Sequence, residues 1–166
     1  MHVKEIMTHP VVTCSVDSNL NSVARLMWEH DCGTIPVVDR EGRLAGIVTD
    51  RDICMAAYTQ GGVLASIPVT TAMAKHVLCS HLDDSVETAE ELMTEGQVRR
   101  VPVIDNDGRP IGIVAMNDLA RLAARAKKGI VDREIVQTLA AICLPRPHPE
   151  RSQMNHEIKG VASASA

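Results

Sequence analysis

The sequence of 166 residues contains almost no aromatic side chains: it has no phenylalanine, one tryptophan (Trp28) and one tyrosine (Tyr58). A protein that binds single-stranded nucleic acid normally offers a row of rings on which bases stack. The net charge is −4, whereas a surface that binds nucleic acid is basic. Both observations argue against nucleic acid as a partner.

Long apolar runs and a disulfide pattern are missing as well. No apolar run approaches the roughly 20 residues that span a bilayer, and the first residues, Met1 to Glu5, do not begin the apolar stretch of a signal peptide. The five cysteines are odd in number and are not spaced like a small disulfide scaffold. We therefore expect no membrane partner and a soluble protein in a reducing cytoplasm.

What the sequence does contain is internal symmetry. When it is shifted by 66 residues, 15 of the 47 pairs between positions 7 and 53 are identical. The identical pairs include prolines, glycines and aspartates, such as Pro36 with Pro102 and Asp52 with Asp118. Two copies are too few for a solenoid, so we expect a pair related by a pseudo-twofold axis.

Each copy has the pattern of a strand, a helix, two strands and a second helix. Residues 11–13, and residues 77–79 in the second copy, predict a strand, and residues 17–19 suit the N-cap of a helix. Residues 34–38 and 44–48 predict a hairpin, with Gly42 in the turn, and the last helix is expected to begin near Thr49. The fold class is therefore α/β (α+β), with two βαββα repeats and a C-terminal helix.

The pattern divides the chain into five parts. The repeats are residues 1–60 and 71–129, and residues 61–70, with two glycines and a proline, connect them. Residues 130–144 predict an amphipathic helix, and 145–166 have the composition of a flexible tail. The apolar side of this helix fits either packing against its own repeat or assembly with another chain.

A candidate ligand site lies where residues 46–52 pass from a strand into a helix. The glycine, Gly46, permits close approach of a ligand, and the helix start offers free amide donors to a phosphate. Thr49 adds a hydroxyl group, Arg51 adds a charge, and Asp52 can accept two hydrogen bonds from a ribose diol.

The same residues also fit a capping box, in which Thr49 and Asp52 bond each other's backbone. In the second copy Ala115 replaces the threonine, although Asp118 remains. An acid that persists without its hydroxyl partner favours ligand contact, but only modestly, because an acid in the first helical turn is favourable by itself.

The chain resembles a tandem pair of cystathionine-β-synthase-type (CBS) domains, a regulatory arrangement called a Bateman module, over about residues 3–125. The segments that carry the resemblance, together with their partners 66 residues later, are Met7, 9–13, 26–27, 35–39, Gly42 and 44–52. Such modules bind an adenine ligand (AMP, ADP, ATP or S-adenosylmethionine), and family members tend to form homodimers.

The resemblance implies that Asp52 and Asp118 hold ribose hydroxyls and that Thr49 contacts the phosphate or ribose. It further implies an adenine slot lined by strand residues of both copies and edged by two more: Ile35, Pro36, Val101 and Pro102, with Thr13 and Cys79 at the edge.

Departures from the family pattern fall in the second copy. Because Ala115 lacks a hydroxyl group, we expect the site with Asn117 and Asp118 to be weaker than the site with Asp52. Arg100, next to Arg99, replaces a neutral residue of the first copy. It either supplies charge for a phosphate or belongs to a solvated basic pair.

No Ser-His-Asp, paired-carboxylate or Walker-type arrangement appears, so we expect a regulatory module rather than an enzyme, with no obligatory cofactor. An unidentified protein partner would then respond to the bound adenine nucleotide. The alternative is a homodimeric assembly protein that is independent of nucleotides, with Trp28 as a candidate dimer contact. A third hypothesis is a metal or redox site at His76, Cys79 and His81, which lacks a fourth ligand.

Overall fold

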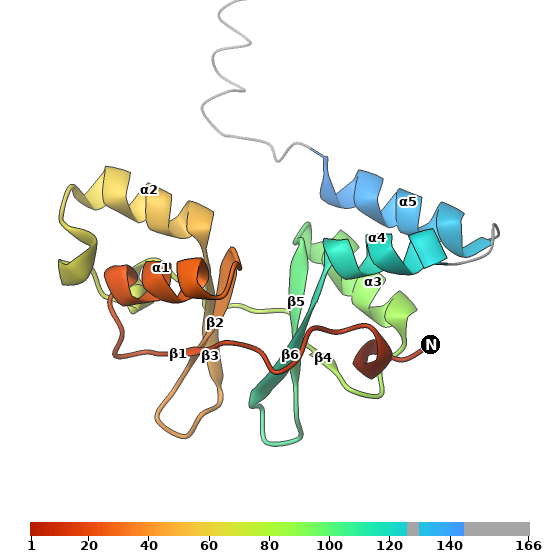
Figure 1. Cartoon of the computed structure of the whole chain (residues 1–166), viewed down its shortest axis with the longest axis horizontal. Coiled ribbons are helices and arrows are strands. Elements are labelled where there is room, and N and C mark those ends of the chain that lie inside the picture. The colour runs from red at the N-terminus through yellow and green to blue at the C-terminus, as the bar shows by residue number, and fades with distance from the viewer. Residues whose placement is uncertain (126–129, 145–166) are drawn as a thin grey trace, which may run out of the picture.

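The structure is a computed structural model, and it describes residues 1–125 and 130–144. It contains two three-stranded sheets at the centre, each flanked by its own helices (Figure 1). The first sheet and its helices are β1 (Cys14–Ser15), α1 (Leu20–Glu29), β2 (Thr34–Val38), β3 (Leu44–Thr49) and α2 (Asp50–Gln60). The second set is β4 (Ser80–His81), α3 (Val86–Gly96), β5 (Arg100–Ile104), β6 (Pro110–Ala115), α4 (Met116–Arg125) and α5 (Ile130–Ile142). Single 3₁₀ turns are η1 (Val3–Glu5), η2 (Leu64–Ser66) and η3 (Val69–Thr71). The predicted fold class is confirmed.

The two sheets have the same topology and the same irregularity. The central strand, β2 or β5, pairs in parallel with the short strand and antiparallel with the last one. In the first sheet Val37 pairs with Gly46 and Val38 with Leu44, so Ala45 is an extra residue in a β-bulge. Ile111 occupies the equivalent position of the second sheet.

The prediction of strands at 11–13 and 77–79 was wrong by three residues. The parallel ladder begins only where Cys14 pairs with Val37, and its counterpart begins where Ser80 pairs with Val103. Val12 is apolar because it packs against the core of the first repeat, outside any ladder. The apolar pattern therefore reported packing rather than strand pairing.

Local signals placed the helices and turns correctly. Asn19 caps α1, because its Oδ1 accepts the backbone N–H of Ser22 at 2.9 Å. Ser85 caps α3 in the same way, through the N–H of Thr88 at 3.1 Å. The hairpin glycine Gly42 has a φ of 80°, a conformation that other residues rarely adopt.

Each repeat receives a segment from the part of the chain that precedes the other. Val3 is fully buried in the second core, and Thr8 bridges to Ile113 of β6. The connector packs on the first repeat, where Ile67 is buried and Ala74 bridges to Ile47 of β3. The two cores are therefore built by exchange, and each repeat is complete only in the presence of the other.

This exchange explains the repeated glycines of β3 and β6. A Cβ atom on Gly46 would lie 2.6 Å from Sδ of Met73 and 2.9 Å from the carbonyl oxygen of Ala74. On Gly112 it would lie 2.5 Å from Sδ of Met7. The expectation that Gly46 admits a ligand was wrong, because the exchanged segment occupies the space.

Helix α5 packs against α3 and α4. Its residues Ile135 and Ile142 are buried in the second core. The helix predicted at 130–144 is thus present over Ile130–Ile142, and packing on its own repeat accounts for its apolar side. The proposed tail, 145–166, and the proposed end of the second repeat at residue 129 lie outside the described residues.

Candidate ligand site between the repeats

The first corner, Thr49–Asp52, joins β3 to α2. The backbone N–H of Thr49 donates to Oδ2 of Asp52 at 2.8 Å, and the Thr49 hydroxyl group donates to the same oxygen at 2.7 Å. The N–H of Asp52 donates back to Oγ1 of Thr49 at 3.3 Å. The capping box is thus present. It uses only Oδ2, and within the described part of the chain Oδ1 of Asp52 accepts no hydrogen bond.

The second corner, Ala115–Asp118, joins β6 to α4 and is arranged differently. Asp118 is buried, with 5% of its surface exposed. Its Oδ2 accepts the backbone N–H of Ala115 at 2.7 Å, and its Oδ1 pairs with the guanidinium group of Arg121. Both oxygens of this carboxylate are therefore occupied by its own helix and strand.

Arg100 extends from the second repeat toward the first corner. A Cβ atom on Gly33 would lie 2.8 Å from Oδ2 of Asp50 and 3.5 Å from Nη2 of Arg100. The N–H of Asp50 in turn donates to the carbonyl oxygen of Gly33 at 3.2 Å. Glycine thus leaves room for an acid of the first repeat and a base of the second to approach each other beside the start of α2.

A cavity of about 330 Å³ lies between the repeats, toward the hairpins. Four apolar side chains, one thiol, three charged groups and a glycine contribute to its walls, which comprise Asp39, Arg43, Leu44, Ala45, Lys75, Val77, Cys79, Ile104 and Gly108. Of the predicted site residues, Cys79 lines it. Burial raises the pKa of the Cys79 thiol, so this group stays protonated at neutral pH.

The cavity and the first corner both lie where β3 and β5 face the other repeat, but at opposite ends of these two strands. Along β3, Thr49 lies four positions after Ala45, and along β5 Ile104 lies four positions after Arg100. At 3.3 Å per residue, either path is about 13 Å long. Because side chains alternate along a strand, Arg100 and Ile104 project from one face of the second sheet, toward the first repeat.

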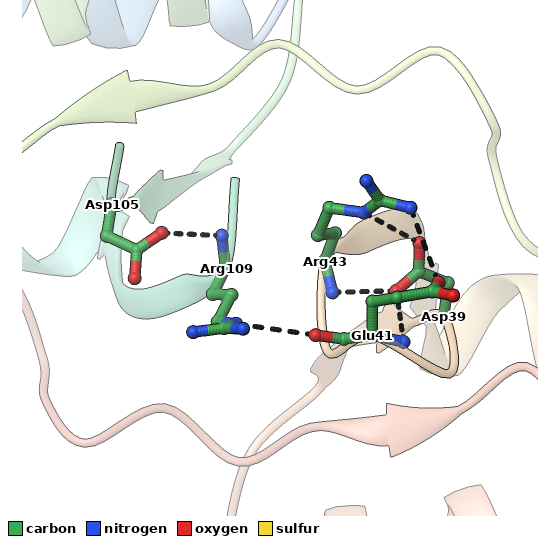
Figure 2. Close-up of polar contacts among 5 residues, drawn as sticks. All are labelled: Asp39, Glu41, Arg43, Asp105 and Arg109. Atoms are coloured by element: carbon green, nitrogen blue, oxygen red, sulfur yellow. Dashed lines mark hydrogen bonds and ion pairs between the residues drawn. The ribbon is translucent and has the colours of Figure 1, made fainter. Parts of the chain in front are cut away.

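Two hairpins close the cavity end and contact each other (Figure 2). The N–H of Leu44 donates to the carbonyl oxygen of Gly108 at 2.8 Å, and Nε of Arg109 donates to that of Glu41 at 3.3 Å. Asp39 accepts the N–H of Arg43 at 2.8 Å. This backbone hydrogen bond, with the paired guanidinium group, lowers the pKa of Asp39.

The remaining predicted site residues are dispersed. Ile35 and Val101 are fully buried, one in each core. Pro36 and Pro102, the next residues along the strands, are also buried. The other three are spread over the two repeats: Arg51 and Asn117 are exposed in the first turns of α2 and α4, and Thr13 is half-buried just before β1.

Two residues near these sites, Arg121 and Lys75, were not predicted from the sequence. The spacing of Asp118 and Arg121 places them one helical turn apart, and this signal was available. No sequence signal placed Lys75 in a cavity. Among the described residues no three His, Cys, Asp or Glu side chains gather as a metal site, so His76, Cys79 and His81 do not form one. Nor is any helix of the described residues long and apolar enough to cross a membrane.

The sequence profile of the CBS domain matches residues 3–58 and 66–125. The chain therefore belongs to the CBS-domain family, and it carries two such domains in tandem. The CBS domain-containing protein YhcV of Bacillus subtilis is 39% identical over 118 residues, which are 71% of this chain and 82% of that protein.

A solved structure agrees with this assignment. The CBS domain pair of protein MJ0100, in complex with 5′-methylthioadenosine and S-adenosyl-L-methionine, matches 76% of this chain and 98% of its own, with a TM-score of 0.70 and 28% identity.

CBS pairs also form parts of larger enzymes. The inosine-5′-monophosphate dehydrogenase of Methanocaldococcus jannaschii is 34% identical over 131 residues, but the chain spans only 25% of that enzyme. CBS pairs thus occur both in small proteins and as parts of larger enzymes.

Proposed function

We propose that this CBS pair is a regulatory module without catalytic activity of its own, which binds an adenosyl ligand between its repeats and acts in the cytoplasm. The ligand is AMP, ADP, ATP or S-adenosylmethionine, and no other cofactor is required. The observation that carries the proposal is the first corner, where Asp52 keeps one carboxylate oxygen for a ribose and Arg100 of the other repeat lies nearby. The adenosyl ligands of the related MJ0100 pair support it.

Each part of the site has a physical role in this proposal. Oδ1 of Asp52 accepts the ribose hydroxyls, while Oδ2 keeps the start of α2 in place. Arg100 and the positive end of the α2 dipole offer positive charge to a phosphate or a carboxylate. The expected free amides are absent at this corner, because the N–H groups of Asp50, Arg51 and Asp52 already donate to protein oxygens. Because the adenine ring is bonded directly to the ribose, it lies between the repeats close to the first corner and does not reach the cavity around Cys79, about 13 Å away along the strands.

Signalling requires that the ligand binds two arrangements of the protein with different affinity. Because the repeats exchange segments, a ligand between them acts on both cores at once. The repeats, a homodimer or an unidentified protein partner would report the change.

Calorimetric titration of the parent chain and of Asp52→Asn with AMP and S-adenosylmethionine tests the proposal. Asparagine retains an oxygen for the cap, but its amide group turns a donor toward the ribose. We expect Asp52→Asn to bind at least about tenfold more weakly, at nearly unchanged stability. Asp17→Asn, an exposed site paired with Arg40, is the control and should bind like the parent. Equal binding by Asp52→Asn contradicts the ribose role.

The alternative, a homodimeric assembly protein independent of nucleotides, is favoured by one observation. Trp28 and Tyr58, the two aromatic residues outside histidine, are 88% and 83% exposed on α1 and α2. Exposed aromatic side chains are typical of protein interfaces. This alternative predicts a dimer whose melting temperature does not change with any adenine nucleotide, whereas a ligand-binding module melts higher when saturated.

A further inference from the structure

The two corner carboxylates differ in how many of their oxygens are occupied. Asp52 receives both of its hydrogen bonds on Oδ2. Asp118 receives one on each oxygen, from the Ala115 backbone and from Arg121. A carboxylate offers about four acceptor positions, so Asp52 keeps one whole oxygen for a ligand, whereas Asp118 presents none that is free of protein.

The internal symmetry identifies the residue responsible. Arg121 lies 66 positions after Met55, so the two occupy the same place in α4 and α2. Methionine has no charge with which to hold an acid, and Met55 is 46% exposed. The side chain of Asp118 is 3% exposed and that of Arg121 is 61% exposed. The guanidinium group therefore covers the carboxylate from the solvent side.

We propose that Arg121 is a specificity-determining residue that closes the second corner, so that the chain binds one adenosyl ligand, at the first corner. The inference rests on the proposed function and adds its stoichiometry. Arginine remains charged at every relevant pH. A neutral ribose diol would have to displace a charge-assisted hydrogen bond to a buried acid, and neutral donors form weaker bonds than charged ones.

The test exchanges the two matched residues. Equilibrium dialysis and calorimetry with AMP and S-adenosylmethionine are expected to give one ligand per parent chain. Arg121→Met frees Oδ1 of Asp118 and should give two. Met55→Arg places a guanidinium group one turn after Asp52 and should weaken binding by about tenfold or more. The double exchange should restore one ligand, now sensitive to Asp118→Asn instead of Asp52→Asn.

Arg25→Met is the matched control. It removes the same charge from an exposed position of α1, where Arg25 pairs with Glu29 at 3.8 Å. This variant should keep one ligand per chain with the affinity of the parent. It separates a local effect of Arg121 from a change in net charge.

The outcomes for the site and for its stoichiometry are distinguishable. Binding of neither probe by the parent contradicts the proposed function and this inference together. Two ligands per parent chain, or one ligand for both the parent and a folded Arg121→Met, contradict the role of Arg121 and leave the proposed function intact. If Arg121→Met does not fold, Met55→Arg decides, because binding like that of the parent would overturn the closing effect of an arginine at this position.

Discussion

The two repeats share one scaffold but differ in what surrounds it. Both have the same strand order and the same bulge, and each has an equivalent exchanged segment paired with its last strand. In the second repeat α5 packs against α3 and α4, and Arg121 forms an ion pair with Asp118 at the corner. In the first repeat the helices carry exposed Trp28 and Tyr58, whose matched residues are Thr94 and Ala124. The second repeat is thus covered at its helices and at its corner acid, whereas the first repeat leaves the corresponding surfaces exposed.

The largest test of this comparison concerns the matched core residues Ile35 and Val101. Both are fully buried, although the family resemblance places them along an adenine slot. Ile35→Ala should lower the free energy of unfolding by about 3 kcal/mol, and Val101→Ala by about 2 kcal/mol, because truncation removes apolar contacts and leaves a cavity. Urea denaturation measures both.

Measuring the ligand affinity of the same two variants shows whether this prediction is wrong. If these side chains contact adenine instead of the core, alanine would weaken ligand binding at unchanged stability. Pro36→Ala, one residue along the same strand, is a useful comparison because its side chain lies on the other face of the sheet.

The glycines that face the exchanged segments give the next largest effect. Gly46→Ala places a Cβ atom 2.9 Å from a backbone oxygen, whereas in Gly112→Ala the corresponding distance, to Thr8, is 3.2 Å. A methionine side chain can move, but a backbone carbonyl group moves at greater cost. We expect losses of about 2 and about 1 kcal/mol, respectively, by urea denaturation.

Met73→Ala is the control for this prediction. It removes the flexible sulfur beside Gly46 but leaves the carbonyl oxygen of Ala74, so it should rescue Gly46→Ala only in part. Complete rescue would show that the side chain, and not the backbone, sets the cost.

The contacts of the exchanged segments could not be predicted from the sequence, whereas local features could. Helix caps such as Asn19 and hairpin turns such as that of Gly42 depend on neighbours within a few residues, and the sequence predicted them. The pairing of Thr8 with Ile113 depends on residues more than a hundred positions apart. No local pattern encodes such a pairing, so Gly46 was attributed to a ligand.

The candidate site was predictable to a similar degree. The repeated acids drew attention to both corners, and the i, i+3 spacing of Asp118 and Arg121 would have distinguished them. Residues 34–37 are all buried, so β2 lacks the alternation that tells a core face from an outer face. The separate orientations of Ile35 and Pro36 were therefore hidden from the sequence.

The corner caps should differ by a smaller amount. Thr49→Ala removes the oxygen that accepts the N–H of Asp52, and it should cost about 1 kcal/mol. Ala115→Thr supplies the missing hydroxyl group to the second corner and should stabilise the protein, by no more than about 1 kcal/mol. Thermal and urea unfolding of both variants measure the two changes. If Thr49→Ala left the stability unchanged, the N-cap of α2 would contribute nothing to it.

The smallest expected effects are electrostatic. They concern Asp39 and Asp83, whose pKa values are both lowered but for different reasons. The backbone N–H of Arg43 is the main cause that lowers the pKa of Asp39, whereas the side chain of Lys4, at 2.6 Å, lowers the pKa of Asp83. An acid whose pKa is lower in the folded state stabilises the fold above its unfolded value, 3.8 for aspartate, and loses this contribution as the pH falls through the folded value. Asp39→Asn and Asp83→Asn should therefore each make the loss of stability below about pH 4 less steep.

Salt should distinguish the two acids, because it screens an exposed ion pair more than a backbone hydrogen bond. At about 1 M salt, where the screening length is about 3 Å, the pKa of Asp83 should return toward its usual value. That of Asp39 should stay low. Carboxyl resonances followed by NMR between low and high salt measure both shifts directly. An equal response of the two groups would show that the charged Arg43 side chain, and not the backbone N–H, keeps the pKa of Asp39 low.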